Sequence, residues 1–171
     1  AGRGGHIVIK ANALVDKSII KLFYRASMAG VKIELIIRGI CCLRPGIEGI
    51  SENISVRSVV GRFLEHSRIY YFQNGGEPEV YLGSADMMPR NIDRRVEVLF
   101  PIEDEDQISR IRDEVLDAYL RDNWKVRLLQ PDGTYERASA ASEEPTTSVQ
   151  ELFLKQRLLW QTDDALVPGS G

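Results

Sequence analysis

The first part of the chain alternates between apolar runs and one helical pattern. Ile7-Val8-Ile9 is typical of a short strand. Asp16 is then a candidate N-cap, apolar residues follow it at helical spacing, and Gly30 suits the position after a helix ends. A second apolar run covers residues 31–38. Strand, helix and strand in this order predict a βαβ unit.

The pattern beyond residue 53 predicts a hairpin and further strands. Residues 54–63 fit either a strand or a short helix. Residues 69–72 and 80–82 are each typical of a strand, and Asn74-Gly75-Gly76 between them is a hairpin turn signal. Residues 94–100 alternate as in another strand.

A helix is predicted to open the last third of the chain. Acidic residues at 104–106 would lie at its N-terminus, where the helix dipole favours negative charge. The apolar stripe of this helix consists of Ile108, Ile111, Val115 and Tyr119. Residues 124–129 are predicted as the last strand and residues 131–133 as a turn. We therefore expect an α/β fold, in which a mixed β-sheet is flanked by helices on both faces.

Three segments divide the chain. Residues 1–137 contain the predicted sheet and form one expected domain, and residues 138–147 are small and polar, as in a linker. Residues 148–171 form an expected C-terminal helix and tail, with Ser148 and Glu151 at capping-box spacing. This helix is too short to be stable alone, so we expect it to dock. The chain does not begin with methionine and opens on no signal peptide, so we expect a fragment of a longer protein.

Charge is unevenly distributed along the 171 residues. Residues 1–29 carry a net charge of +4, residues 30–100 carry 0 and residues 101–171 carry -7, for a total of -3. This is not the basic domain that a long nucleic-acid footprint requires. No apolar stretch approaches the ~18–20 residues of a membrane-spanning helix. Eight of the nine basic residues in the middle segment are arginine, which suits forked bonds to phosphate or carboxylate oxygens, or surface ion pairs.

Cys41 and Cys42 are adjacent and cannot join distant segments. Reduced thiols of this kind favour a cytoplasmic protein. Neither a zinc-ligand spacing nor a GxxxxGK[ST] phosphate loop is present. The glycine-rich stretch 39–53 instead follows a predicted strand, and open α/β sheets bind ligands at such strand ends.

Of the two histidines, one is placed for chemistry. His6 lies in a terminus that we expect to be frayed and inert. His66-Ser67-Arg68 leads into a strand, and residues two apart on a strand face the same way, so His66 and Arg68 could address one spot. A structural, hydrogen-bonded role is the alternative for His66. Gly83-Ser84-Ala85-Asp86 follows at the end of the next strand.

These two steps resemble half of the signature of phospholipase D-like enzymes. That signature has an HxK step, a strand, a short hairpin and a Gly-Ser-x-Asn step. Here Arg68 stands at the Lys position, Asp86 at the Asn position, and Gln73 where the signature has Asp.

Longer blocks resemble the last domain of bacterial polyphosphate kinases of the first family. The likeness runs from about Ile9 to Tyr135. Its blocks are Ile37–Gly46, Ser51–Ile54, Gly61–Ile69, Ser84–Asp86 and Met88–Glu97. The resemblance implies the second of the family's two phospholipase D-like domains, and therefore a phospholipase D-like sheet.

The resemblance also implies a reaction and its partners. The family reversibly transfers the terminal phosphate of ATP to inorganic polyphosphate, with Mg²⁺. Its phosphorylated histidine belongs to the first phospholipase D-like domain, so the nucleophile and most Mg²⁺ contacts would lie in upstream domains of the same polypeptide. We expect ATP or ADP and polyphosphate as partners, a homo-oligomeric full-length enzyme, and an isolated chain without kinase activity.

Two ATP-contacting positions of the family map onto this chain, Arg38 in the RGxC block and His66 in the LEHSR block. These residue types suit the chemistry, because arginine can clamp phosphate oxygens and a protonated histidine can bond or protonate them. No residue is predicted as a metal ligand. The further candidates for phosphate binding are Arg68, Arg90 and Arg94. The candidate supporting residues are Ser84, Asp86, Asp93 and Glu97.

Two other functions are compatible with the sequence. One is a phospholipase D-like phosphodiesterase or nuclease, although the missing Lys, the presence of Gln73 and the single copy of the motif count against it. The other is a non-catalytic module that binds anions or dimerises.

Overall fold

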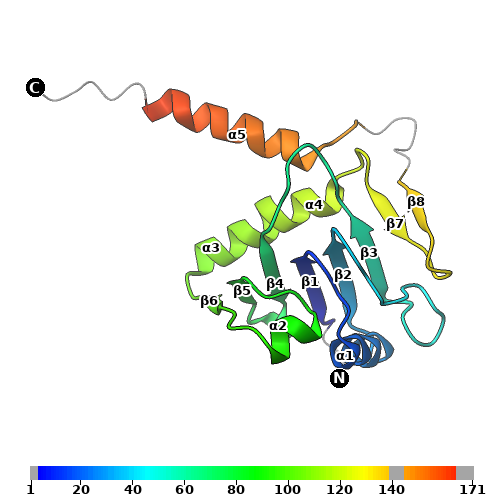
Figure 1. The fold of residues 1–171 in the computed structure, drawn as a ribbon. Coiled ribbons are helices and arrows are strands. Elements are labelled where there is room, and N and C mark those ends of the chain that lie inside the picture. The colour runs from blue at the N-terminus through cyan, green and yellow to red at the C-terminus, as the bar shows by residue number, and fades with distance from the viewer. Residues whose placement is uncertain (1–3, 139–144, 165–171) are drawn as a thin grey trace, which may run out of the picture.

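The computed structural model describes residues 4–138 and 145–164, and within residues 157–164 only the helix itself. Its described part holds one eight-stranded sheet in the order β6-β5-β4-β1-β2-β3-β7-β8 (Figure 1). The strands are β1 (His6–Ala11), β2 (Lys32–Ile37), β3 (Ile54–Ser58), β4 (Arg68–Phe72), β5 (Glu79–Gly83), β6 (Leu99–Ile102), β7 (Arg127–Leu129) and β8 (Tyr135–Arg137).

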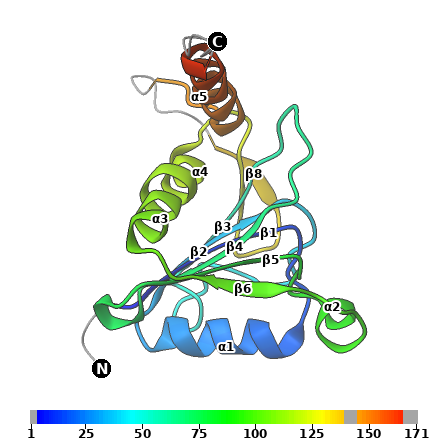
Figure 2. The same ribbon diagram turned by 90° about the vertical axis from the view of Figure 1, so that its left-hand side faces the viewer.

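Helices cover both faces of the sheet, as Figure 2 shows. On one face lies α1, and on the other a continuous helical stretch formed by α3, a π-helical segment η2, and α4. The helical bounds are α1 (Lys17–Met28), η1 (Asn74–Gly76), α2 (Pro89–Asp93), α3 (Glu105–Arg110), η2 (Ile111–Leu116), α4 (Asp117–Arg121) and α5 (Val149–Asp164). The predicted α/β class, with helices on both faces, is confirmed. No helix in the described ranges has the length and apolar character needed to cross a membrane.

The sheet is mixed, and its centre is parallel. β1 pairs in parallel with β2, and β2 in parallel with β3. β4 pairs antiparallel with β1 on one side, and β7 pairs antiparallel with β3 on the other. The predicted βαβ unit is therefore present as β1, α1 and β2, and the predicted hairpin joins β4 to β5 in an antiparallel pair.

Alternation along the strands builds a separate core on each face. In β2, Ile33 and Leu35 are buried against the α1 side, where Phe23 of α1 joins the same cluster. Ile36, which follows Leu35, points to the opposite face and belongs to the other cluster, with Tyr119 of α4. Because side chains alternate between the faces of a strand, a nearly continuous apolar run is what a strand covered on both sides requires.

The ends of α1 follow the sequence signals. The carboxylate of Asp16 accepts hydrogen bonds from the backbone amides of Ser18 and Ile19, both at 2.9 Å, so it is the N-cap. Gly30 follows the helix with a φ of 85°, a left-handed conformation that glycine adopts without strain. Both predictions are confirmed.

The expected strand at 94–100 is only partly correct. The strand β6 is Leu99–Ile102, whereas Arg94 is the C-cap of α2. Between them, the carboxylate of Glu97 accepts hydrogen bonds from Ser84 and from Asn91, the latter at 2.6 Å. These contacts hold residues 95–98 out of the sheet, so the strand predicted from alternation began too early.

The expected last strand at 124–129 is shorter, and it is not the last. The backbone of Lys125 has a φ of 62°, which breaks the extended conformation, so β7 begins at Arg127. After the predicted turn at 131–133, the chain returns as β8 and pairs antiparallel with β7. The segment Tyr135–Arg137 is short and polar, and its sequence has no apolar alternation that would predict a strand.

The C-terminal helix α5 docks through its first turn. Val149 is fully buried, and its amide donates to the carboxylate of Asp122 at 2.8 Å. Asn123 holds the preceding segment by accepting from the amide of Thr147 at 2.7 Å. Most of the expected linker, residues 139–144, lies outside the described residues.

His6 is not frayed, contrary to the expectation. It lies in β1, and its Nε2 is 2.7 Å from the carboxylate of Glu34 on β2. This hydrogen bond, and to a lesser degree that from Lys32, lower the pKa of Glu34 to about 2.

We expect Glu34→Gln to lower the free energy of unfolding by about 2 kcal/mol at pH 7, since each pKa unit corresponds to about 1.4 kcal/mol and part of the shift is screened. The pKa of Glu34 is depressed in the folded chain, so its stabilisation is complete above the ordinary value of 4.5. The difference from the parent should shrink as the pH falls from 4.5 towards 2. Urea unfolding across this range measures it, with the exposed Glu48→Gln as control; a difference independent of pH would contradict the prediction.

Candidate functional site

Four strand ends meet at one edge of the sheet. The C-terminal ends of the parallel strands β1 and β2 lie there, together with the start of β4 and the end of β5, because β4 is antiparallel to both β1 and β5. From β1 the chain proceeds to β2 on one side and later to β4 on the other. Open α/β sheets bind ligands at the carboxyl ends of strands where the strand order reverses in this way.

Asp86 ties two of these strand ends together. Its carboxylate accepts hydrogen bonds from the amide of Asn12 at 2.8 Å and from Nε and Nη2 of Arg68 at 3.3 and 3.0 Å. The Asp86 side chain is 8% exposed and that of Arg68 is 16% exposed. Burial alone would raise the pKa of Asp86, but the bonds from Arg68 and Asn12 outweigh it and lower that pKa. Asp86 is therefore an ionised anchor for the Arg68 guanidinium.

Arg38 lies just beyond the end of β2, on the other side of Asn12. Its Nε donates to the side-chain oxygen of Asn12 at 3.1 Å, and its carbonyl accepts from Ser58 at 3.2 Å. Arg38 is half-buried, and within the described ranges the two terminal nitrogens of its guanidinium make no protein hydrogen bond. Arg38 is therefore held through its Nε, and its two Nη atoms can donate to a ligand.

The backbone at Arg38 requires a glycine next to it. Gly39 donates its amide to the carbonyl of Asn12 at 2.8 Å. A Cβ at this position would lie 2.9 Å from that same oxygen, which is closer than real Cβ contacts allow. The small residue after Arg38 thus lets the ends of β1 and β2 approach closely, and this fixes Arg38 against Asn12.

Lys10 brings a third positive charge to this edge. It is only 6% exposed, and its Nζ lies 2.8 Å from the hydroxyl of Ser67 and 3.0 Å from the carboxylate of Glu65. Burial lowers the pKa of Lys10, Glu65 opposes that shift, and the positive charges of Arg38 and Arg68 add to it. Lys10 therefore lies near both arginines, and we call the strand ends that carry Lys10, Arg38 and Arg68 the cationic edge.

His66 is exposed at the same edge, in the loop between β3 and β4. Its carbonyl accepts a hydrogen bond from Nη1 of Arg68 at 2.6 Å. The residue on either side of it, Glu65 and Ser67, is bonded to Lys10. The backbone around His66 is thus fixed while its imidazole is open to solvent, and Arg68 links it to Asp86.

The other predicted residues form a second group. The hydroxyl of Ser84 donates to the carboxylate of Glu97 and accepts from the amide of Val98 at 3.1 Å. Glu97 therefore binds Ser84 and Asn91 rather than an arginine. Exposed positions on or next to α2 are occupied by Arg90, Asp93 and Arg94, which make no side-chain hydrogen bond or ion pair within the described ranges.

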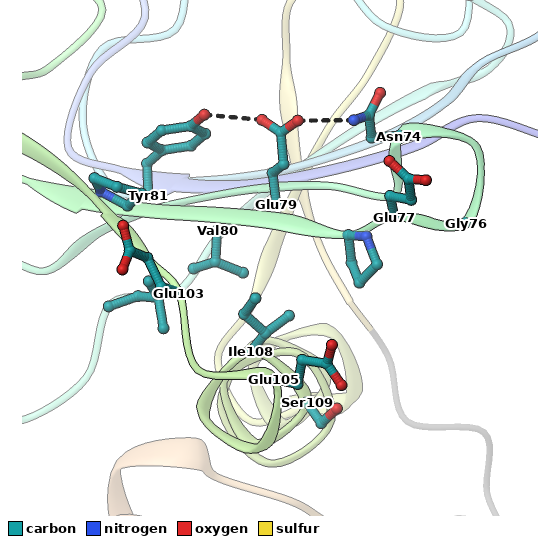
Figure 3. A pocket seen from close by; sticks show the side chains of 13 residues that line it. Asn74, Gly76, Glu77, Glu79, Val80, Tyr81, Glu103, Glu105, Ile108 and Ser109 are labelled. Atoms are coloured by element: carbon teal, nitrogen blue, oxygen red, sulfur yellow. Dashed lines mark hydrogen bonds between the residues drawn. The ribbon is translucent and has the colours of Figure 1, made fainter.

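A separate cavity of about 630 Å³ lies at the opposite end of the sheet, between the β4–β5 turn, β6 and the start of α3 (Figure 3). Its lining carries four carboxylates. These belong to Glu77, Glu79, Glu103 and Glu105. Tyr81 and Asn74 donate to Glu79, as the dashed lines in Figure 3 show. Such a lining repels polyanions, so this cavity does not suit an anionic ligand.

The chain offers no suitable set of metal ligands in the part that the structure describes. No three His, Cys, Asp or Glu side chains gather there closely enough to hold an ion. Mg²⁺ requires oxygen ligands, whereas the groups at the candidate edge are mainly cationic. The residues present therefore do not fit a Mg²⁺ site.

Sequence reasoning missed Lys10, Asn12, Glu65 and Gln150 as neighbours of this edge. Lys10 did carry a signal, because a lysine inside the apolar strand pattern IVIKA must find a buried partner. Asn12 follows that strand directly. Gln150 gave no signal, since its contacts are with residues 85 or more positions away.

The sequence profile of the family described as "Polyphosphate kinase C-terminal domain 2" matches residues 1–150 of the chain. Polyphosphate kinase 1 of Chlorobaculum tepidum is 54% identical over 154 residues, which cover 90% of this chain and 22% of that protein. The polyphosphate kinase of Prosthecochloris aestuarii is 56% identical over 152 residues, or 89% of this chain and 21% of that protein. The chain thus spans about a fifth of the length of these relatives.

Two solved structures resemble the fold. The crystal structure of polyphosphate kinase from Porphyromonas gingivalis matches with a TM-score of 0.84 and 40% identity, over 91% of this chain and 24% of that one. NucT from Helicobacter pylori matches with a TM-score of 0.50 and 14% identity, over 68% of this chain and 77% of that one. At this identity the second match shows a shared fold alone.

Proposed function

The chain belongs to the polyphosphate kinase family, as its C-terminal domain, and from this premise we propose that it forms the half of the active site that contacts the nucleotide and the transferred phosphate. One observation carries the proposal: Asn12 and Asp86 connect Arg38 to Arg68 at the cationic edge of the sheet, and Arg68 bonds the backbone of the exposed His66.

The proposed reaction is reversible transfer of the terminal phosphate of ATP to inorganic polyphosphate. We propose that the phosphohistidine nucleophile lies in an upstream domain of the same polypeptide. Mg²⁺ would neutralise charge on the nucleotide phosphates, and upstream residues would hold most of it, because this domain lacks a suitable set of ligands. This division of labour would leave the isolated chain without kinase activity.

Phosphoryl transfer depends mainly on positioning and on stabilising charge on the phosphate oxygens. The free Nη atoms of Arg38 would bind those oxygens bidentately. Arg68 is held by Asp86 and adds positive charge at the same edge. The imidazole of His66, when protonated, would bond the transferred group or protonate the leaving diphosphate oxygen.

We do not extend a phosphodiesterase function to this chain. The likeness to NucT concerns the fold alone, at 14% identity. In addition, Arg68 and Asp86, which stand at two positions of the phospholipase D-like signature, bond each other in an ion pair. A phosphodiesterase would need those groups for its substrate.

Arg38→Met tests the proposal in a full-length polyphosphate kinase that carries this domain. We expect kcat/KM for ATP to fall about 10- to 100-fold, because hydrogen bonds to charged groups contribute about 1.5–3 kcal/mol. ATP synthesis from ADP and polyphosphate should fall similarly, since the reaction is reversible. Arg38→Lys should recover little, because lysine lacks the planar fork. Arg110→Met, on the exposed side of α3, is the matched control; parental kcat/KM in Arg38→Met would disprove the proposed contact.

A further inference from the structure

The loop between β3 and β4 (residues 59–67), which carries His66, closes around one side chain from the distant helix α5. That side chain is Gln150, in the first turn of α5, and it is 8% exposed. Its Oε1 accepts from the amide of Phe63 at 2.8 Å, and its Nε2 donates to the carbonyl of Phe63 at 2.9 Å. The amide thus pairs with the loop backbone at two points, as a neighbouring strand would.

The loop is shaped to accept this amide. A Cβ on Gly61 would collide with the side-chain amide of Gln150, so the glycine leaves the space that Gln150 fills. Figure 1 shows the loop rising from β3 towards the start of α5 before it returns to β4. The loop therefore contacts Gln150 through specific hydrogen bonds and a matching space, and not through general apolar packing.

From Gln150 a partly buried polar network continues to the residues beside His66. Nε2 of Gln150 also donates to Glu65 at 2.9 Å. Glu65 accepts from the hydroxyl of Tyr119 at 2.7 Å and contacts Lys10, which bonds Ser67. Burial would raise the pKa of Glu65, but the bonds from Tyr119, Lys10 and Gln150 outweigh it, so Glu65 stays ionised. The residues before and after His66 are therefore fixed by one connected set of groups.

The first turn of α5 is a firm support for this network. Val149 is fully buried and is capped by Asp122. Phe153, one turn later, packs edge-on against Tyr119 with ring centroids 5.8 Å apart. Tyr119 in turn bonds Glu65, so α5, α4 and the loop hold one another.

We propose that Gln150 is a positioning residue for His66, an inference that rests on the proposed function of His66 in phosphoryl transfer. Gln150 does not meet the substrate. It holds the loop so that the exposed imidazole would face the phosphate that Arg38 binds. Misplacement of a reacting group by about 1 Å can cost up to 100-fold in rate, so loosening this loop should lower kcat more than it raises KM.

Gln150→Met removes the hydrogen bonds and keeps the volume. In the full-length kinase we expect kcat to fall about tenfold while KM for ATP changes less than twofold. Asn123→Ala is the matched control, because Asn123 anchors the segment that leads into α5 and does not touch the loop. It should leave kcat within twofold of the parent. An equal loss in both variants would overturn the proposal, since a general loosening of α5 would then explain it.

A double-mutant cycle with His66→Ala separates positioning from folding. If Gln150 acts through His66, Gln150→Met should change kcat less than twofold in the His66→Ala background. The same loss in both backgrounds would overturn the proposal. If His66→Ala itself leaves kcat unchanged, the proposed function fails and this inference falls with it, whereas a large effect of His66→Ala with none from Gln150→Met refutes this inference alone.

Gln150→Glu gives an independent test that does not depend on a loss of folding. Its carboxylate would repel Glu65 when ionised, but when protonated it can donate one of the two hydrogen bonds that the amide donates. The ratio of its kcat to that of the parent should therefore rise as the pH falls from 8 to 6. A ratio that stays constant would contradict the proposal.

Discussion

His66→Ala in the full-length polyphosphate kinase is expected to lower kcat about 100-fold or more, the range observed when a positioned proton donor or acceptor is lost. His66 is the exposed imidazole at the cationic edge, and its backbone is fixed by Arg68 on one side of the loop. We expect the imidazole to act on the transferred phosphate only if its loop is held, and the bonds of Glu65 and Ser67 to Lys10 hold that loop. The rate of polyphosphate synthesis from ATP under saturating ATP measures the change.

His6→Asn is the matched control for that experiment. His6 lies at the start of β1, which is the other end of the strand from the candidate edge, and it bonds Glu34. Its replacement should affect stability but leave kcat within about twofold. Hydrolysis of bis-p-nitrophenyl phosphate is assayed on the same samples. Parental kcat in His66→Ala would instead favour the non-catalytic, anion-binding alternative. Release of p-nitrophenol that depends on His66 would favour the phosphodiesterase alternative.

Local patterns predicted those parts of the fold that local physics decides. The N-cap at Asp16, the left-handed Gly30 and the alternation of β2 each depend on residues within one turn or one strand. The errors arose where distant groups override the local pattern. Ser84 and Asn91 bond Glu97, so β6 begins later than alternation predicted. The strand β8 forms because it pairs with β7.

In the candidate site too, the sequence identified single residues but not the contacts between distant segments. Arg38 and His66 could be selected from the sequence because both stand next to strands in recognisable blocks. The bond between Arg68 and Asp86 could not, because it spans 18 positions and depends on how β4 and β5 pair. Gln150 lay beyond sequence reasoning altogether, since 87 positions separate it from Phe63.

Asp86→Ala is expected to destabilise the chain by about 3 kcal/mol, because removing one partner of a buried ion pair leaves the other charge uncompensated. The value lies at the low end of the usual range because the Arg68 side chain is 16% exposed and water can reach it. The substitution also removes the acceptor for the amide of Asn12, at the end of β1. Urea unfolding of the chain at pH 7 gives the difference.

The pH dependence of this difference identifies its cause. The pKa of Asp86 is lowered below its ordinary value of 3.8, so its stabilisation is complete above that pH and is lost as the pH falls through the lower, folded value. The gap between parent and Asp86→Ala should therefore narrow below about pH 4. Asp113→Ala, which breaks an exposed pair with Arg112, should change stability little at any pH. If Asp86→Ala behaved like Asp113→Ala, the ion pair would not be what anchors Arg68, and the cationic edge would need another support.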